Sequence, residues 1–178
     1  LAAQAALEIL KNGGNAMDSA IAGAVLLGIC EPQMTGIGGD CFILFSPSGS
    51  NEIKSMNGSG PAPSLANAND LRERELSSIP LDSPHAVTIP CAIDAFCKLS
   101  EDWGTLGLDT ILQPAIHYAT HGVPIAERVA YDIAKLTENL NSAGKEFYLP
   151  WGRAPKVGEF FAHPGQVKVL KEIAKHGR

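Results

Sequence analysis

One segment near the start of the chain limits the possible folds more than any other. Residues 16–28 are almost all alanine, isoleucine, valine, leucine or glycine. A helix that is apolar on every face must be surrounded by other elements, and its small residues let those neighbours approach closely. The apolar run is too short to cross a membrane, which takes about 20 residues. We therefore expect the 16–28 helix to be among the most buried elements.

The residues that precede this helix predict a second helix and a sharp connection. Apolar side chains recur at helical spacing over residues 1–11, and the asparagine and two glycines of residues 12–14 end that pattern, because glycine accepts the left-handed conformation that often follows a helix. Asn15 is a suitable N-cap for the next helix. Asp18 then falls in its first turn, where a negative charge suits the helix dipole.

A turn-rich segment, residues 31–40, separates the apolar helix from a predicted β-hairpin. Residues 41–45 form a short apolar run, and residues 52–56 alternate like a returning strand. The serine, proline and glycine between them are typical of a turn, so we expect a hairpin with a fairly buried first strand. Residues 57–63 are rich in glycine and proline and should break regular structure.

The second half of the chain is mostly helical in pattern. Asp109 is expected to cap a helix over residues 111–120, which should end at Gly122. We predict a short polar helix or turn at 66–76, a short strand at 86–89, and helices at 92–101, 111–120, 126–140 and 167–175. The expected fold class is therefore α+β, mainly helical with a β-hairpin.

Composition excludes several kinds of protein. With 45% hydrophobic and 19% charged residues, the chain is not of the disordered type. Its net charge of −5, without a basic stripe, argues against a nucleic-acid partner. The four cysteines, Cys30, Cys41, Cys91 and Cys97, match neither a zinc pattern nor a redox C-x-x-C. We interpret them as structural thiols, which favours the cytoplasm over the periplasm or the cell exterior.

Local motifs do not assemble a catalytic or metal site. Gly36-x-Gly38-Gly39 lies between a helix and a strand, whereas a dinucleotide-binding loop needs strand, glycines and helix in that order. A sharp turn with close backbone packing fits better. His117 and His121 are four residues apart but lack an obvious third ligand, so we interpret them as surface histidines. We expect no metal and no cofactor.

Several motifs in a fixed order resemble one known family. They are Asn12 to Ala20 (NGGNAMDSA), Glu31-Pro32, Gly36 to Phe42 (GIGGDCF), Ala86 to Pro90, Trp103 to Leu106, Gln113 to Ile116 and Gly122 to Ile125. Together they are similar to the γ-glutamyltranspeptidase family of N-terminal-nucleophile hydrolases. The resemblance covers nearly the whole chain, which makes it far more specific than any one glycine loop.

The resemblance implies a four-layer αββα sandwich for the parent protein. Residues 1–178 then correspond to the first part of the large subunit, truncated at both ends. Members of the family make one precursor that cleaves itself, and the new N-terminal threonine of the small subunit is the nucleophile, with its own α-amine as base. This chain holds no Thr-Thr-His-like processing site, so no catalytic residue is expected in it, and alone it should be inactive. The implied partners are the rest of the large subunit, the small subunit and a small-molecule amide substrate.

The resemblance also implies a substrate-binding segment, Asn57, Gly58, Ser59, Gly60 and Pro61. In the family an arginine just before an Ala-Pro pair grips the substrate α-carboxylate, a task that suits a planar, permanently charged group. Here Pro61 stands in its place. We expect residues 57–63 to line a pocket or its rim, without the carboxylate clamp.

The implied activity is cleavage of γ-glutamyl or related amide bonds. Asp40 and the missing arginine look more like a less characterised branch of the family than like the glutathione enzymes. That branch, and neighbours such as cephalosporin acylases and oxamate amidohydrolase, cleave other amides. Arg72 or Arg74 could compensate from the following segment, but they are more typical of a solvated surface. Two alternatives stay open: an amide hydrolase without γ-glutamyl specificity, and a degenerate, non-enzymatic binding module.

Overall fold

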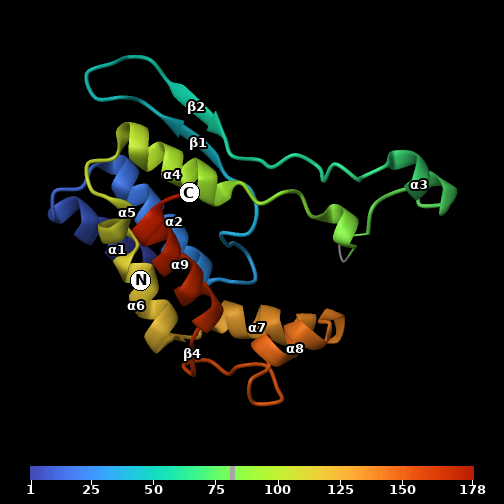
Figure 1. Cartoon of the computed structure of the whole chain (residues 1–178). Helices are drawn as coiled ribbons and strands as arrows, with labels where there is room; N and C mark the ends of the chain where they lie inside the picture. Colours follow the sequence, from blue (N-terminus) through green and yellow to red (C-terminus); the bar gives the residue numbers. More distant parts are fainter. Residues whose placement is uncertain (81–82) are drawn as a thin grey trace. The chain divides into compact units, whose positions relative to one another are not determined.

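A computed structural model describes residues 1–80 and 83–178 of the chain. The chain divides into two compact units (Figure 1): a larger one of Leu1–Gly36 with Phe96–Arg178, and a smaller one of Ile37–Ala95. Helices dominate, and the strands described form two-stranded antiparallel pairs, of which β1 with β2 is a hairpin. The predicted mainly helical α+β fragment with a β-hairpin is thus confirmed.

The larger unit begins with two helices packed against each other, α1 (Ala2–Lys11) and α2 (Ala16–Cys30). The predicted stop between them is confirmed, with Gly13 at a φ of +92°. Helix α2 is as buried as expected, and it extends two residues past Gly28. Its fully buried apolar side chains are Ile21, Ala22, Val25, Leu26 and Ile29. No helix in the described residues combines the length and apolarity that a membrane crossing requires.

Helices from the end of the chain complete the larger unit. Helix α9 packs against α5 and α6, and α2 contacts both of these as well. The two-residue strands β3 and β4 pair with Val123 opposite Phe161. The bounds are α5 Leu108–Ile111, α6 Gln113–His121, β3 Val123–Pro124, α7 Glu127–Leu136, η2 Thr137–Asn139, α8 Ser142–Tyr148, β4 Phe160–Phe161 and α9 Pro164–His176.

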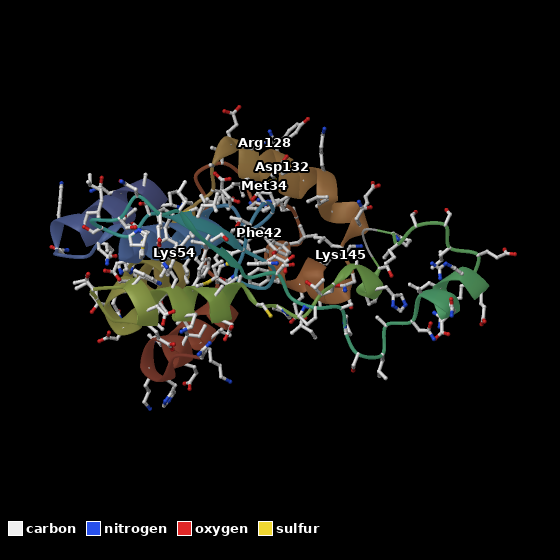
Figure 2. The ribbon with its side chains drawn as sticks, turned by 90° about the horizontal axis from the view of Figure 1, so that it is seen from above. Met34, Phe42, Lys54, Arg128, Asp132 and Lys145 are labelled. Atoms are coloured by element: carbon white, nitrogen blue, oxygen red, sulfur yellow. The ribbon has the colours of Figure 1, made fainter. Side chains whose placement is uncertain are left out.

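A second apolar cluster lies where α7, α8 and β4 meet. Its buried members are Ile125, Val129, Ile133 and Phe161, with aromatic side chains of α8 packed against them. The outer face of α7 is polar: Arg128 Nε donates to Asp132 Oδ2 at 2.7 Å, one helical turn away (Figure 2). One face of this helix is therefore apolar and the other polar, as expected for an amphipathic surface helix.

The smaller unit contains the predicted hairpin, β1 (Phe42–Phe45) with β2 (Lys54–Asn57). In its register Phe42 faces Asn57 and Phe45 faces Lys54; Phe42 and Lys54 are labelled in Figure 2. The expected burial of the first strand is wrong: Phe42 and Leu44 are 74% and 77% exposed. They share one face of a two-stranded ribbon, and none of the described residues of this unit buries that face.

Two short helical elements and the start of a longer helix follow in the smaller unit. Helix α3 (Ala68–Glu73) occupies the middle of the segment predicted as short and polar. Helix α4 (Ala92–Trp103) agrees with the helix predicted at 92–101. The strand predicted at 86–89 is wrong. Pro84 instead starts a 3-10 turn, η1 (Pro84–Ala86), with Ser83 as its cap, and the residues after it form no ladder.

Three other differences concern helix boundaries. Asp109 does not cap a helix over 111–120, because α5 already starts at Leu108 and Asp109 lies in its first turn. The helix predicted at 111–120 is divided between α5 and α6, because Pro114, near the start of α6, has no N–H to donate to the preceding turn. The helix predicted at 126–140 divides into α7 and the 3-10 turn η2, and α8 was not predicted at all.

Candidate functional site

The predicted substrate segment lies in the smaller unit, where it continues the hairpin. Cys41 and Gly58 exchange backbone hydrogen bonds of 3.3 and 2.8 Å just beyond the last paired residues of β1 and β2. Asn57 Oδ1 then accepts from Ser59 N at 2.8 Å, which turns the chain out of the ladder. The segment 57–61, which we call the candidate loop, is therefore held by a strand at its start.

Two positions in the candidate loop admit only glycine. A Cβ atom on Gly58 would lie 2.6 Å from Ala95 Cβ and 2.7 Å from Cys41 Sγ. A Cβ atom on Gly60 would overlap the carbonyl oxygen of Ile89. Neither glycine has a positive φ, so turn geometry does not explain them. Close approach of neighbouring atoms does: the Ala95 and Cys41 side chains at Gly58, and the Ile89 backbone at Gly60.

Hydrogen bonds from two other segments fix the far end of the loop. Asp40 Oδ1 accepts from Gly60 N at 3.1 Å and from Thr88 Oγ1 at 3.3 Å. Ile89 N donates to the Pro61 carbonyl oxygen at 3.0 Å. The loop is thus joined to the start of the hairpin and to the segment before α4, although 20 and 48 residues separate Asp40 from its two partners.

The charges around the candidate loop differ from those of a carboxylate clamp. Pro61 is exposed and has neither a charge nor a side-chain donor. Of the two alternative cations, Arg72 lies on α3, where its Nη1 donates to Asn69 Oδ1 at 3.1 Å, and Arg74 follows the last residue of that helix. Among the described residues, the carboxylate of Asp40 is hydrogen-bonded to the loop, at Gly60 N. The substrate-binding role of residues 57–61 stays a prediction.

The cysteines are free thiols in the described residues. Burial, assisted by the Asp40 carboxylate, raises the pKa of the Cys41 thiol, and burial also raises the pKa of Cys30. Cys41 Sγ lies 3.8 Å from the carbonyl oxygen of Ala92. A thiol whose pKa is raised carries little thiolate at neutral pH and is a poor nucleophile.

No cluster of three or more potential metal ligands occurs within residues 1–80 and 83–178. His117 and His121 are both on α6, with ring centroids 4.5 Å apart, and His121 Nδ1 is 2.9 Å from the carbonyl oxygen of His117. Gly36 and Gly39 make close backbone contacts. Gly36 packs against Gly28: a Cβ atom added to Gly28 would lie 3.1 Å from Gly36 Cα. The carbonyl oxygen of Gly39 accepts hydrogen bonds from Cys91 N and Ala92 N.

Two of the sequence motifs meet in the larger unit, which sequence reasoning missed. Asn15 and Asp18 form a reciprocal capping box at the start of α2, as the predicted cap required. Asp18 is fully buried, and its Oδ2 also accepts from Thr105 N at 2.9 Å and Leu106 N at 3.1 Å. Asn15 Nδ2 donates to the Trp103 carbonyl oxygen at 2.6 Å. These motif residues therefore connect helices and are not placed for chemistry.

The larger unit also carries open cavities. One of about 310 Å³ is lined mainly by aromatic side chains, and one of about 320 Å³ lies between α1 and α6. The aromatic cavity is bordered by Glu146, Phe147, Trp151, Phe160, Phe161 and three small or cyclic residues. Neither cavity involves the candidate loop.

Comparisons with known proteins identify the same family as the sequence motifs. Residues 2–178 match the family described as gamma-glutamyltranspeptidase. The glutathione hydrolase-like YwrD proenzyme of Bacillus subtilis is 34% identical over 181 residues, which are 100% of this chain and 34% of that protein. The oxamate amidohydrolase proenzyme of Klebsiella pneumoniae is 33% identical over 99% of this chain and 34% of its own length. The chain spans about a third of the length of these curated relatives.

Solved structures have a similar fold over nearly the whole of this chain. A cephalosporin acylase from Bacillus halodurans superposes with a TM-score of 0.92 at 34% identity, over 99% of this chain and 34% of that one. A γ-glutamyltranspeptidase from Helicobacter pylori gives the same TM-score of 0.92 at 24% identity, over 99% of this chain and 52% of that one, and shows likeness of fold alone.

Proposed function

The chain belongs to the γ-glutamyltranspeptidase family, and from this premise we propose that it is part of an amide-bond hydrolase. The match over residues 2–178, with hydrolases among the relatives, carries the proposal. The substrate is a small molecule with a γ-glutamyl or related amide bond. The second candidate is an acylase or other amide hydrolase without γ-glutamyl specificity, which Pro61 favours because it supplies no charge for an α-carboxylate.

The nucleophile of this reaction lies outside the chain. In the proposed mechanism, an N-terminal threonine created by self-cleavage of the precursor attacks the amide carbonyl, and its α-amine takes the hydroxyl proton. The amine leaving group departs with a proton, and water then hydrolyses the acyl-threonine ester. The candidate loop orients the acyl group of the substrate, so this chain contributes binding and not bond cleavage. Without the rest of the precursor it is inactive.

The exposed apolar face of β1 supports the proposal that residues 1–178 are a partial large subunit. Phe42 and Leu44 lie on the same face, and each is more than two-thirds exposed. Burying a side chain of this size stabilises a fold by roughly 1.5–3 kcal/mol. We propose that the remainder of the precursor, the large-subunit residues beyond this chain or the small subunit, covers this face.

Expression of the full-length precursor tests the function. Mass spectrometry should detect two fragments, the second beginning with threonine, and the cleaved product should release p-nitroaniline from acyl anilides. A Thr→Ala substitution at that new N-terminus is the matched control and should abolish both cleavage and turnover. An uncleaved precursor without amidase activity would contradict the proposal and support the degenerate, non-enzymatic binding module.

The role of the loop is tested by restoring the missing cation. Pro61→Arg should raise kcat/KM for a γ-glutamyl anilide by about 10- to 100-fold, the value of one charge-assisted contact, while changing turnover of a simple acyl anilide little. Pro63→Arg, at an exposed proline two residues away, is the control. If the parent already prefers the γ-glutamyl anilide, or if both arginine variants behave alike, the loop does not bind the α-carboxylate end of the substrate.

A further inference from the structure

The candidate loop contacts a negative charge at the point where a carboxylate clamp would need a positive one. Asp40 Oδ1 accepts hydrogen bonds from Gly60 N and Thr88 Oγ1, at 3.1 and 3.3 Å. These two bonds fix the orientation of the carboxylate group. Asp40 is exposed, and its second oxygen, Oδ2, has no hydrogen-bond partner in the described residues. Oδ2 is therefore an oriented acceptor, open to solvent, beside the residue that replaces the family's arginine.

At Asp40 a ligand that reaches this loop meets a charged acceptor, and the loop itself offers no charged donor. A substrate ammonium or amide N–H can donate to Asp40 Oδ2, whereas a substrate carboxylate would place two like charges near each other. At about 4 Å in water, one such pair changes binding by about fivefold, and more where solvent is displaced. The loop has no charged side chain of its own that would compensate, since residues 57–61 are Asn, Gly, Ser, Gly and Pro.

We propose that Asp40 is a substrate-binding residue that makes this site select amides whose acyl group carries an ammonium or neutral group, and reject acyl groups that end in a carboxylate. The inference rests on the proposed function, because it takes residues 57–61 to be the substrate loop. It goes further in assigning the selectivity to one side chain. It selects the second candidate function, an amide hydrolase without γ-glutamyl specificity, and it excludes glutaryl-type acyl groups as good substrates.

Asp40→Asn tests the charge of this side chain separately from its hydrogen bonds. The amide oxygen of asparagine can still accept from Gly60 N and Thr88 Oγ1, so the hydrogen bonds that hold the loop are retained. The negative charge is lost. Asp70→Asn is the matched control, because Asp70 is another exposed carboxylate of the same unit and its side chain makes no hydrogen bond within the described residues.

The experiment uses the self-cleaved full-length enzyme and three p-nitroanilides that differ at one carbon. The butyryl anilide is the neutral reference, the 4-aminobutyryl anilide adds an ammonium group at C4, and the glutaryl anilide adds a carboxylate there. We expect kcat/KM to fall from 4-aminobutyryl to butyryl to glutaryl, with a ratio of at least about fivefold between the first and last. Asp40→Asn should reduce that ratio to near one, and Asp70→Asn should leave it unchanged.

The outcomes separate the two proposals. Turnover of the butyryl anilide with an equal or greater preference for the glutaryl anilide overturns the inference and leaves the amidase intact. A preference for 4-aminobutyryl that persists in Asp40→Asn overturns the assignment to Asp40. If that variant does not self-cleave, the salt dependence of the wild-type ratio decides: it should shrink between 0.05 and 1 M NaCl, where the screening length falls from about 14 to about 3 Å. An uncleaved precursor that hydrolyses none of the anilides refutes the proposed function, and the inference fails with it.

Discussion

Acid should open the region around His163, because this histidine is buried in its neutral form. The side chain is 0% exposed, and its ring packs edge-on against Phe161 with centroids 5.0 Å apart. Neither ring nitrogen has a hydrogen-bond partner in the described residues. Burial lowers the pKa of His163 from 6.5 to about 4, and the backbone of Ile29, which does not reach hydrogen-bond geometry, opposes this only in part.

The sign of the effect follows from which state takes up the proton. The unfolded chain binds a proton near pH 6.5 and the folded chain only near pH 4, so protonation favours unfolding. The stabilising effect is fully present above pH 6.5 and is lost as the pH falls through this window. The full loss is roughly 3.5 kcal/mol, from a difference of 6.5 − 4 = 2.5 pH units at about 1.4 kcal/mol each. Between pH 7 and pH 5 the expected loss is about 2 kcal/mol.

Hydrogen exchange in the full-length protein measures this locally. The amide of His163 donates to the Ala119 carbonyl oxygen at 2.8 Å, so its exchange reports opening of the segment before α9. After correction for intrinsic rates, the opening free energy of wild type should fall by about 2 kcal/mol from pH 7 to pH 5. His163→Phe keeps an aromatic ring but cannot titrate, and should show almost none of this slope; His117→Gln, at an exposed histidine, should keep it. Equal slopes in wild type and His163→Phe would refute the reasoning.

Two further predictions concern buried backbone groups. Asp18→Ala leaves three backbone N–H groups without an acceptor and should lower the free energy of unfolding by about 3–5 kcal/mol, whereas Asp18→Asn retains an acceptor oxygen and should cost only about 1–2 kcal/mol, as chemical denaturation can measure. Similar losses in the two variants would contradict this account of Asp18. Gly60→Ala should displace the candidate loop from Ile89 and accelerate limited proteolysis within residues 57–61. Gly38→Ala, where an added Cβ meets nothing within 4 Å, should not; equal cleavage of both would count against the steric argument.

The sequence predicted those parts of the fold that short-range physics determines. Helix α2 could be recognised because no face of it is polar, and its cap because Asn15 and Asp18 are close in sequence. The strand predicted at 86–89 failed for the complementary reason. Val, Thr and Ile favour extended backbone, and Val87 does adopt it, with φ −92° and ψ 120°. A strand also needs a partner, and Ile89 contributes one backbone hydrogen bond, to Pro61, where a ladder needs several.

The burial of β1 could not be predicted from its own residues. Its apolar run indicates that the strand is compatible with a core, but burial depends on whether another element covers it. In the smaller unit Phe42 and Leu44 have no such cover. The same limit applies to α8, whose seven residues are too few to show a helical period.

The candidate loop shows why a motif can be recognised while its chemistry remains hidden. The resemblance to the family predicts that Pro61 stands in place of an arginine, but the sequence does not say which charge lies nearby. Asp40 reaches Gly60 and Thr88 only because the hairpin ladder extends to Cys41 and Gly58 and the segment before α4 pairs with Pro61. From the sequence alone, a carboxylate that follows a glycine-rich turn is interpreted as a solvated surface residue, because its contacts are not known. In our proposal the missing cation at Pro61 and the carboxylate of Asp40 both act against a substrate carboxylate. Asp40→Asn should then remove only the repulsion, and Pro61→Arg should supply only the missing positive charge.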